Sequence, residues 1–255
     1  MRIVEERVKM RVGSVPYVNA RPLVWALPDL GVEVVYAVPS ELPTLLESGE
    51  VSAILVSSIE VLRRDDLIQI GDVGIVSQRH VDSVRMFSKV PMDQIESLAL
   101  DQSSMTSNAL ALGILRSNGV HPVTRVMSPD LEQMLNECDA GILIGDIGMD
   151  QDAGDLYVYD LGEQWTQLTG LPFVWAVWTA KRGVDLGELP DQLNEAYQRS
   201  KEPIEMEHVI ADAMLRSGWD RQKTEKYLLE TMSFEIGVNE RNALIEFKKL
   251  ISLNW

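Results

Sequence analysis

The chain has 255 residues, of which 45% are hydrophobic and 24% charged, so it is long and apolar enough to bury a core and is not a disordered chain. Its formal net charge of -16 argues against binding to nucleic acid or to an anionic membrane surface, because phosphate groups would be repelled.

Cysteine and histidine are scarce, which limits the metal and redox chemistry open to the chain. Cys138 is the only cysteine, and the three histidines have no zinc-binding spacing. We therefore expect no disulfide, no metal and no cofactor. The charged first residues do not form a secretory signal, and no stretch is apolar enough to span a bilayer. We expect a cytoplasmic protein without a membrane partner, while the role of residues 1–9 and the oligomeric state stay open.

Short apolar runs alternate with helical patterns in chain order. Strands are expected at residues 11–15, 33–38, 52–56, 98–100, 124–127, 141–144 and 173–179. Helices are expected between them and from Leu189 to the end, with caps at Ser40, Ser103, Ser128, Asp220 and Asn239. This alternation predicts an α/β fold with mostly parallel sheets flanked by helices. One set of strands precedes residue 98 and another follows it, which predicts two lobes.

Polar residues collect after four of the predicted strands, where ligands bind in open parallel sheets. They are Tyr17, Asn19 and Arg21; Ser57 and Ser58; Ser103, Ser104, Thr106 and Ser107; and Asp146. Tyr17, Asn19 and Arg21 alternate, so an extended loop would aim them the same way. The hydroxyls near Ser103 crowd a helix start, whose unpaired N–H groups and dipole favour an anion by about 0.3–1 kcal/mol per contribution. The sequence therefore predicts a cleft for a small carboxylate ligand.

Each of these residues also has a purely structural explanation. Ser103 or Ser104 caps a helix as readily as it binds a ligand. Arg21 is more often an ion-pair partner than a substrate clamp, and Asn19 is a common turn residue. Asp146 is equally suited to a cap. Both explanations stand at this point for every residue of the group.

An ordered series of motifs resembles the chorismate dehydratases of the futalosine route to menaquinone. The series comprises residues 12–23, 52–60, 83–89, 100–107, 141–146, 160–165 and 169–178. The resemblance implies the two-lobed type II periplasmic-binding-protein fold. One lobe would hold residues 10–98 and 178–255, the other would hold residues 99–177, and the ligand cleft would lie between them.

The resemblance also implies an activity, the dehydration of chorismate to 3-[(1-carboxyvinyl)oxy]benzoate, with chorismate as the small-molecule partner. Asn19 matches the key residue of that family, and Asp146 is a second catalytic candidate. Substrate binding would fall to the hydroxyl and aromatic groups of the cleft with one arginine, namely Tyr17, Arg21, Ser57, Ser58, Ser88, Ser103, Ser104, Thr106 and Ser107.

Three other functions compete with this interpretation. A non-catalytic binding protein for small carboxylates shares the fold, and a regulatory domain that has lost activity would look the same in sequence. The sister dihydroxynaphthoate synthase relies on a histidine just after the strand at 141–144. This chain has Gly145 and Asp146 there, which favours the dehydratase over its sister.

Overall fold

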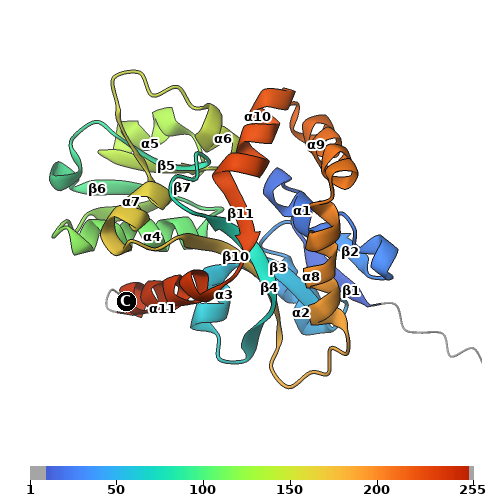
Figure 1. Cartoon of the computed structure of the whole chain (residues 1–255). Coiled ribbons are helices and arrows are strands. Elements are labelled where there is room, and N and C mark those ends of the chain that lie inside the picture. Colours follow the sequence, from blue (N-terminus) through green and yellow to red (C-terminus); the bar gives the residue numbers. More distant parts are fainter. Residues whose placement is uncertain (1–9, 253–255) are drawn as a thin grey trace, which may run out of the picture.

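Two sheets organise residues 10–252, the part of the chain that the computed structural model describes (Figure 1). Residues 1–9, whose role the sequence leaves open, and residues 253–255 lie outside the described part. Each sheet forms one half of the molecule with its flanking helices. Within residues 10–252, no helix is both long and apolar enough to cross a membrane.

The first sheet has six strands. Their order is β11 (Met232–Glu235), β4 (Leu67–Ser77), β10 (Phe173–Lys181), β3 (Ala53–Ser57), β1 (Arg11–Ser14) and β2 (Glu33–Tyr36). Strand β1 pairs in parallel with β2 and β3, whereas β10 runs antiparallel between β3 and β4. Strand β3 is buried over four of its five residues, as expected for a strand covered on both faces.

The second sheet repeats this arrangement with five strands. Their order is β7 (Val123–Met127), β6 (Ser97–Asp101), β8 (Ala140–Ile144), β5 (Val84–Ser88) and β9 (Tyr157–Asp160). Strands β7, β6 and β8 are parallel, and β5 runs antiparallel between β8 and β9. In both sheets the strand that follows a crossover from the other sheet, β10 or β5, runs antiparallel to its neighbours, and β11 also pairs antiparallel with β4. The fold is therefore the two-lobed α/β architecture expected from the sequence.

Helices flank both sheets. The α-helices are α1 (Arg21–Val24), α2 (Leu42–Ser48), α3 (Ser58–Arg63), α4 (Met105–Ser117), α5 (Leu131–Glu137), α6 (Gly145–Asp150), α7 (Leu161–Thr169), α8 (Leu189–Ser200), α9 (Pro203–Ser217), α10 (Arg221–Glu225) and α11 (Val238–Ser252). Short 3-10 turns are η1 (Val18–Ala20), η2 (Pro28–Leu30) and η3 (Met92–Gln94), and a π-helical segment, η4, spans Lys226–Thr231. Helix α11 packs against β10, α3 and α4, so it contacts both halves (Figure 1).

The expected lobe boundaries are wrong at both crossovers. The second sheet begins at Val84 rather than at residue 99, and β10 lies in the first sheet from Phe173 onward. The chain changes sheet in the segments 78–83 and 161–172. Strands β4, β5 and β9 were absent from the sequence expectation, so the crossovers could not be placed from it. In the C-terminal part, β11 pairs with β4 of the first sheet.

Four helix starts and one helical stretch also differ from the sequence expectation. Glu41, Ser104 and Asp130, rather than Ser40, Ser103 and Ser128, precede α2, α4 and α5, and Asn239 lies inside α11. The region after Leu189 is interrupted by β11, which pairs with β4 and closes one edge of the first sheet.

Aromatic packing anchors the second crossover. The Trp165 ring packs edge-on against Phe173 and Phe247 at centroid distances of 5.3 and 6.1 Å. The Trp165 indole N–H donates to the carbonyl oxygen of Pro172 at 2.8 Å. This buried cluster joins α7, β10 and α11, so the second crossover is held by the core of the protein.

Candidate functional site

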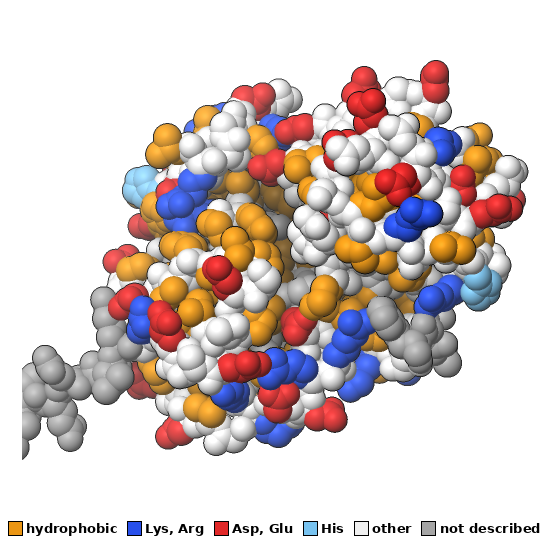
Figure 2. All heavy atoms as spheres, turned by 180° about the vertical axis from the view of Figure 1, so that it is seen from behind, with side chains coloured by type: hydrophobic (Ala, Val, Ile, Leu, Met, Phe, Trp, Pro, Cys, Tyr) orange, Lys and Arg blue, Asp and Glu red, His pale blue; other side chains and the backbone are white. Residues whose placement is uncertain are grey.

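The carboxyl ends of parallel strands from the two sheets meet between the lobes. The loop after β1, the start of α3 after β3, the start of α4 after β6 and the start of α6 after β8 all begin at such ends. In a space-filling view the surface is hollowed between the two halves of the molecule (Figure 2). All four polar clusters expected from the sequence have a member linked there. Ser57 is hydrogen-bonded to Thr106, and the charges of Asp101 and Asp146 act on Tyr17.

Asn19 is held at this edge by a residue far away in the sequence. Its Nδ2 donates to the Tyr227 hydroxyl at 3.4 Å, and that hydroxyl lies 3.0 Å from Ser83 Oγ. Asn19 Oδ1 is buried and has no hydrogen-bond partner within the described residues. One end of the Asn19 amide is therefore hydrogen-bonded and the other is not. A substrate-binding amide has this property before its ligand arrives.

Hydroxyl groups at the start of α4 connect the lobes. Ser57 Oγ, at the end of β3, is hydrogen-bonded to Thr106 Oγ1 of α4, which also accepts from the Ile59 N–H at 3.4 Å. Ser104 caps α4 and donates to Ser107 Oγ at 2.7 Å. The structural explanation and the ligand-binding explanation of these hydroxyls are therefore compatible. The hydroxyl groups cap α4 and also line the junction between the strand ends.

Asp101 ends β6 directly below this helix start. Its Oδ1 accepts from the Ser103 N–H at 2.8 Å and from Ser103 Oγ at 2.6 Å. Its Oδ2 is buried without a hydrogen-bond partner within the described residues. The carboxylate therefore shapes the loop that leads into α4 and leaves one acceptor oxygen for a further donor.

Two carboxylates act on the tyrosine of the β1 loop. Burial and the negative charges of Asp101 and Asp146 raise the pKa of Tyr17, so its phenol stays protonated at neutral pH. Burial also raises the pKa of Asp146; the charge of Asp150 adds to this effect and that of Lys223 opposes it. The charge of Asp146 thus acts on the Tyr17 hydroxyl, which links the end of β8 to the loop after β1.

Arg21 does not point into this site, because the expected extended loop is instead a 3-10 turn, η1, that leads into α1. Its Nε lies 2.7 Å from Asp212 Oδ2, an ion pair in which the N–H is not aimed at the oxygen. Its Nη1 donates to the Tyr36 hydroxyl at 2.5 Å. The side chain is only 6% exposed, and its charged group is held by Asp212 and Tyr36.

Ser88 is also absent from the site. The antiparallel register sets Ser88 opposite Ala140 and Val84 opposite Ile144, so Ser88 lies at the far end of the sheet from Asp146. Its hydroxyl donates to the Val90 carbonyl at 2.7 Å. Ser58 does lie at the β3 end, where its buried Oγ has no hydrogen-bond partner within the described residues.

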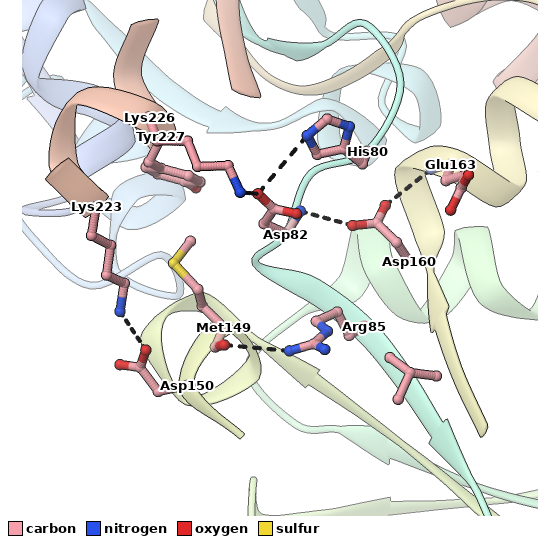
Figure 3. Close-up of a pocket in the computed structure, with 11 residues that line it drawn as sticks. His80, Asp82, Arg85, Met149, Asp150, Asp160, Glu163, Lys223, Lys226 and Tyr227 are labelled. Atoms are coloured by element: carbon pink, nitrogen blue, oxygen red, sulfur yellow. Dashed lines mark hydrogen bonds and ion pairs between the residues drawn. The ribbon is translucent and has the colours of Figure 1, made fainter. Parts of the chain in front are cut away.

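A cavity of about 440 Å³ lies beside this site, where the crossovers meet the C-terminal segment (Figure 3). Lys223 of α10 forms an ion pair with Asp150 of α6, and Arg85 donates to the carbonyl oxygen of Met149 (Figure 3). Tyr227 lines the cavity with its buried ring. The ion pair ties the C-terminal segment to the second lobe.

Sequence reasoning missed Tyr227 as a candidate and quoted Ser83 only as part of a motif. Tyr227 lies in a helical region with no polar cluster around it, so no local signal marked it. No strand was expected after Ser83, and ligands were expected only where strands end, so nothing in the sequence marked Ser83.

The comparisons with known proteins agree on one family. A sequence model of the family described as "Menaquinone biosynthesis" matches residues 10–252. A protein of Thermus thermophilus named chorismate dehydratase is 35% identical over 189 residues, which are 67% of this chain and 69% of that protein. A Campylobacter jejuni protein of the same name is 28% identical over 249 residues, 94% of this chain and 96% of that protein.

Solved structures agree on the fold. A protein of Archaeoglobus fulgidus superposes with a TM-score of 0.72 at 17% identity, covering 96% of this chain and 97% of that one. The periplasmic aliphatic sulphonate binding protein of Escherichia coli superposes with a TM-score of 0.67 at 15% identity, covering 96% and 87%. At these identities the likeness shows a periplasmic-binding-protein-like fold and nothing about the ligand.

Proposed function

Because the chain belongs to the menaquinone biosynthesis family, we propose that it is a chorismate dehydratase, a hydro-lyase that converts chorismate to 3-[(1-carboxyvinyl)oxy]benzoate. The observation that carries this proposal is the half-bonded amide of Asn19 at the junction of the lobes. The names of the two relatives support the same substrate and reaction.

The reaction removes a ring proton and a ring hydroxyl. The C3–H bond breaks, its electrons form the new ring double bond, and the C4–O bond breaks as that hydroxyl leaves. The proton and the hydroxyl together make the water that is lost. Because the ring becomes aromatic, the enzyme mainly has to align the breaking bonds and exclude competing reactions.

Asn19 fits an aligning role. An amide is neutral and a poor base, so it acts by hydrogen bonding and fixes the pose of the substrate. A buried polar atom without a partner costs about 1–3 kcal/mol, and a bound substrate that supplies the partner recovers that cost. The enolpyruvyl carboxylate of the substrate itself then takes the C3 proton, and Asp146 is the alternative base.

The start of α4 fits the binding of a substrate carboxylate. The helix has 13 residues, and its first N–H groups and the hydroxyls of Ser104, Thr106 and Ser107 gather at the lobe junction. These hydroxyls bond to one another or to Ser57, and a hydroxyl can rotate to donate to an anion. Positive dipole and donors together offset the nearby charges of Asp101 and Asp146.

Gly145 supports the dehydratase over the sister naphthoate synthase. It follows β8 at the position where the sister enzyme would carry histidine, and its φ is 62°. Residues other than glycine adopt this left-handed conformation at a cost of about 1–2 kcal/mol. The backbone conformation at this position therefore favours glycine.

The cytoplasmic location remains a prediction of the sequence.

The test is to mix the purified protein with chorismate and to identify products by liquid chromatography with mass detection. We expect an aromatic enolpyruvyl ether that is one water lighter than chorismate. If chorismate raises the melting temperature but is not consumed, the protein is a binding protein. If chorismate neither binds nor reacts, the proposed substrate is wrong.

A further inference from the structure

We propose that Tyr227 is a positioning residue for the reaction, because its hydroxyl bridges Asn19 and Ser83 and so fixes the Asn19 amide. The inference deepens the proposed function and rests on it. Asn19 follows β1 of the first sheet, and Ser83 directly precedes β5 of the second. Tyr227, from the C-terminal segment, joins the two through one oxygen atom.

The surroundings of Tyr227 hold its side chain in one place. The residue is 4% exposed, and its ring packs edge-on against Trp219 at a centroid distance of 5.3 Å. Ser83 is 5% exposed. A hydroxyl held this way has little freedom to leave its partners, so it transmits a fixed position to the amide.

The local backbone explains how Tyr227 reaches the site. It lies in the π-helical segment η4, which follows α10 directly. Such wide turns are rare and occur frequently at functional sites. On one side of this segment, Lys223 of α10 forms an ion pair with Asp150 of α6. On the other, the segment leads into β11, which pairs with β4. Contacts at both ends thus hold the irregular turn.

The phenol has one proton and accepts hydrogen bonds. Burial raises the pKa of Tyr227, its hydrogen bonds with Ser83 and Asn19 oppose this, and the charges of Asp146 and Asp82 add to it. The side chain therefore stays a neutral hydroxyl at neutral pH. When Asn19 Nδ2 donates a hydrogen bond to the Tyr227 hydroxyl, that hydroxyl can itself donate a hydrogen bond to Ser83 Oγ. Asn19 Oδ1 is then the end of the amide that is free to bind the substrate.

Removal of the Tyr227 hydroxyl should free the Asn19 amide to rotate while the Tyr227 ring keeps its place. In Tyr227→Phe the ring still packs on Trp219, whereas the Asn19 amide rotates freely. Misplacement of a positioning group by about 1 Å costs on the order of 100-fold in rate. We expect kcat for chorismate to fall about 10- to 100-fold with KM within about threefold of the wild type.

The control is Tyr197→Phe, which removes the hydroxyl of a second buried tyrosine, whose ring packs on Phe234 at a centroid distance of 5.5 Å. It should leave kcat unchanged. If Tyr227 only stabilised the fold, its replacement would lower the measured rate only by reducing the amount of folded protein. In the Asn19→Ala background, therefore, Tyr227→Phe should change the residual rate less than about twofold, because there is no amide left to orient.

The outcomes separate the two proposals. Wild-type protein that does not consume chorismate overturns the dehydratase function and this inference with it. Active wild-type protein with a Tyr227→Phe variant of equal kcat overturns this inference alone. If Tyr227→Phe does not fold, Ser83→Ala removes the other partner of the hydroxyl, and a kcat equal to that of the wild type is then the contradicting result.

Discussion

The ion pair between Arg21 and Asp212 leads to a quantitative prediction, which tests whether Arg21 binds the substrate or stabilises the folded protein. Arg21 Nε and Asp212 Oδ2 are 2.7 Å apart, with side chains 6% and 20% exposed. Arg216 Nε lies 2.7 Å from the same oxygen. Asp212 therefore neutralises two cations, the buried Arg21 and the more exposed Arg216. Loss of Asp212 and loss of Arg21 should for this reason destabilise the folded protein by different amounts.

Asp212→Ala leaves the buried guanidinium with the Tyr36 hydroxyl but without a carboxylate. Removal of one partner of a buried pair costs about 3–5 kcal/mol. For a chain of this length each kcal/mol lowers the melting temperature by about 2–4 °C, so we expect a fall of about 6–20 °C. Arg21→Met leaves Asp212 paired with Arg216, so its cost should be smaller, about 2 kcal/mol.

The assay combines thermal unfolding with chorismate kinetics at a temperature where every variant is folded. The double variant should lose less stability than the sum of the single losses, because both changes break one contact. KM for chorismate should stay within about threefold of the wild type. A stable Arg21→Met protein with a KM raised about tenfold or more would refute the reasoning and return Arg21 to the substrate site.

Three further predictions concern Asp146, Asp139 and Gly148. Asp146→Asn should lower kcat less than about tenfold, because the substrate carboxylate is the proposed base; a loss of about 10²–10⁴-fold would assign that role to Asp146. Asp139→Asn should cost about 1–2 kcal/mol at pH 7 by unfolding in urea, because the Asp139 carboxylate accepts from Ser97 Oγ at 2.8 Å. Gly148→Ala should cost about 1–3 kcal/mol, because an added Cβ would lie 2.7 Å from the Leu143 carbonyl oxygen.

The Asp139 effect has a defined pH dependence. Hydrogen bonds from Ser97 and the backbone N–H groups of Glu96 and Ser97 lower the pKa of Asp139 in the folded protein. The stabilisation is therefore present above the carboxyl pKa of the unfolded chain and is lost as the pH falls through the folded value. The difference between wild type and Asp139→Asn should shrink in acid, and a constant difference would contradict this explanation.

The control for Gly148 is Gly237→Ala. There the added Cβ would meet only Glu240 Oε2, at 3.3 Å, a much looser contact than the one with the Leu143 carbonyl oxygen. Its cost should be clearly smaller than that of Gly148→Ala. Equal costs would mean that the Leu143 contact does not limit the packing of α6.

The sequence predicted the strand ends at which most of the candidate residues lie, because strand ends are a local property of the chain. The apolar runs of β1, β3, β6 and β8 are short and bounded by polar residues, and in parallel sheets their carboxyl ends meet. Contacts or charge interactions link Tyr17, Asn19, Thr106 and Asp146 to this junction as a result. The α4 start was expected within two residues of its position, because Ser104 is a strong capping residue.

Strand direction was the property that the sequence could not supply. β5 was not expected, and it runs antiparallel, so Ser88 at its carboxyl end lies away from the site while Ser83 before it lies within. Strand β4 was not expected either, because Gly71 and Gly74 interrupt its apolar pattern. The antiparallel β5 and β10 decide which lobe each segment joins, so the lobe boundaries failed with them.

Long-range contacts were equally hidden. Tyr227 and Asn19 are 208 residues apart, and the π-helical turn that brings Tyr227 to the site has no recognised sequence signal. Arg21 differs for a local reason. A 3-10 turn at Val18–Ala20 replaces the expected extended loop, and Arg21 therefore points toward Asp212 instead of following Asn19.

The most direct test of the account is the rate of chorismate dehydration by Asn19→Ala, measured beside the wild type on protein of the same melting temperature. The account predicts a folded variant that has lost about 10²-fold or more in kcat, because the amide that aligns the substrate is gone. An Asn19→Ala protein that dehydrates chorismate at the wild-type rate would contradict the account, since the chemistry would then lie somewhere other than this junction of strand ends.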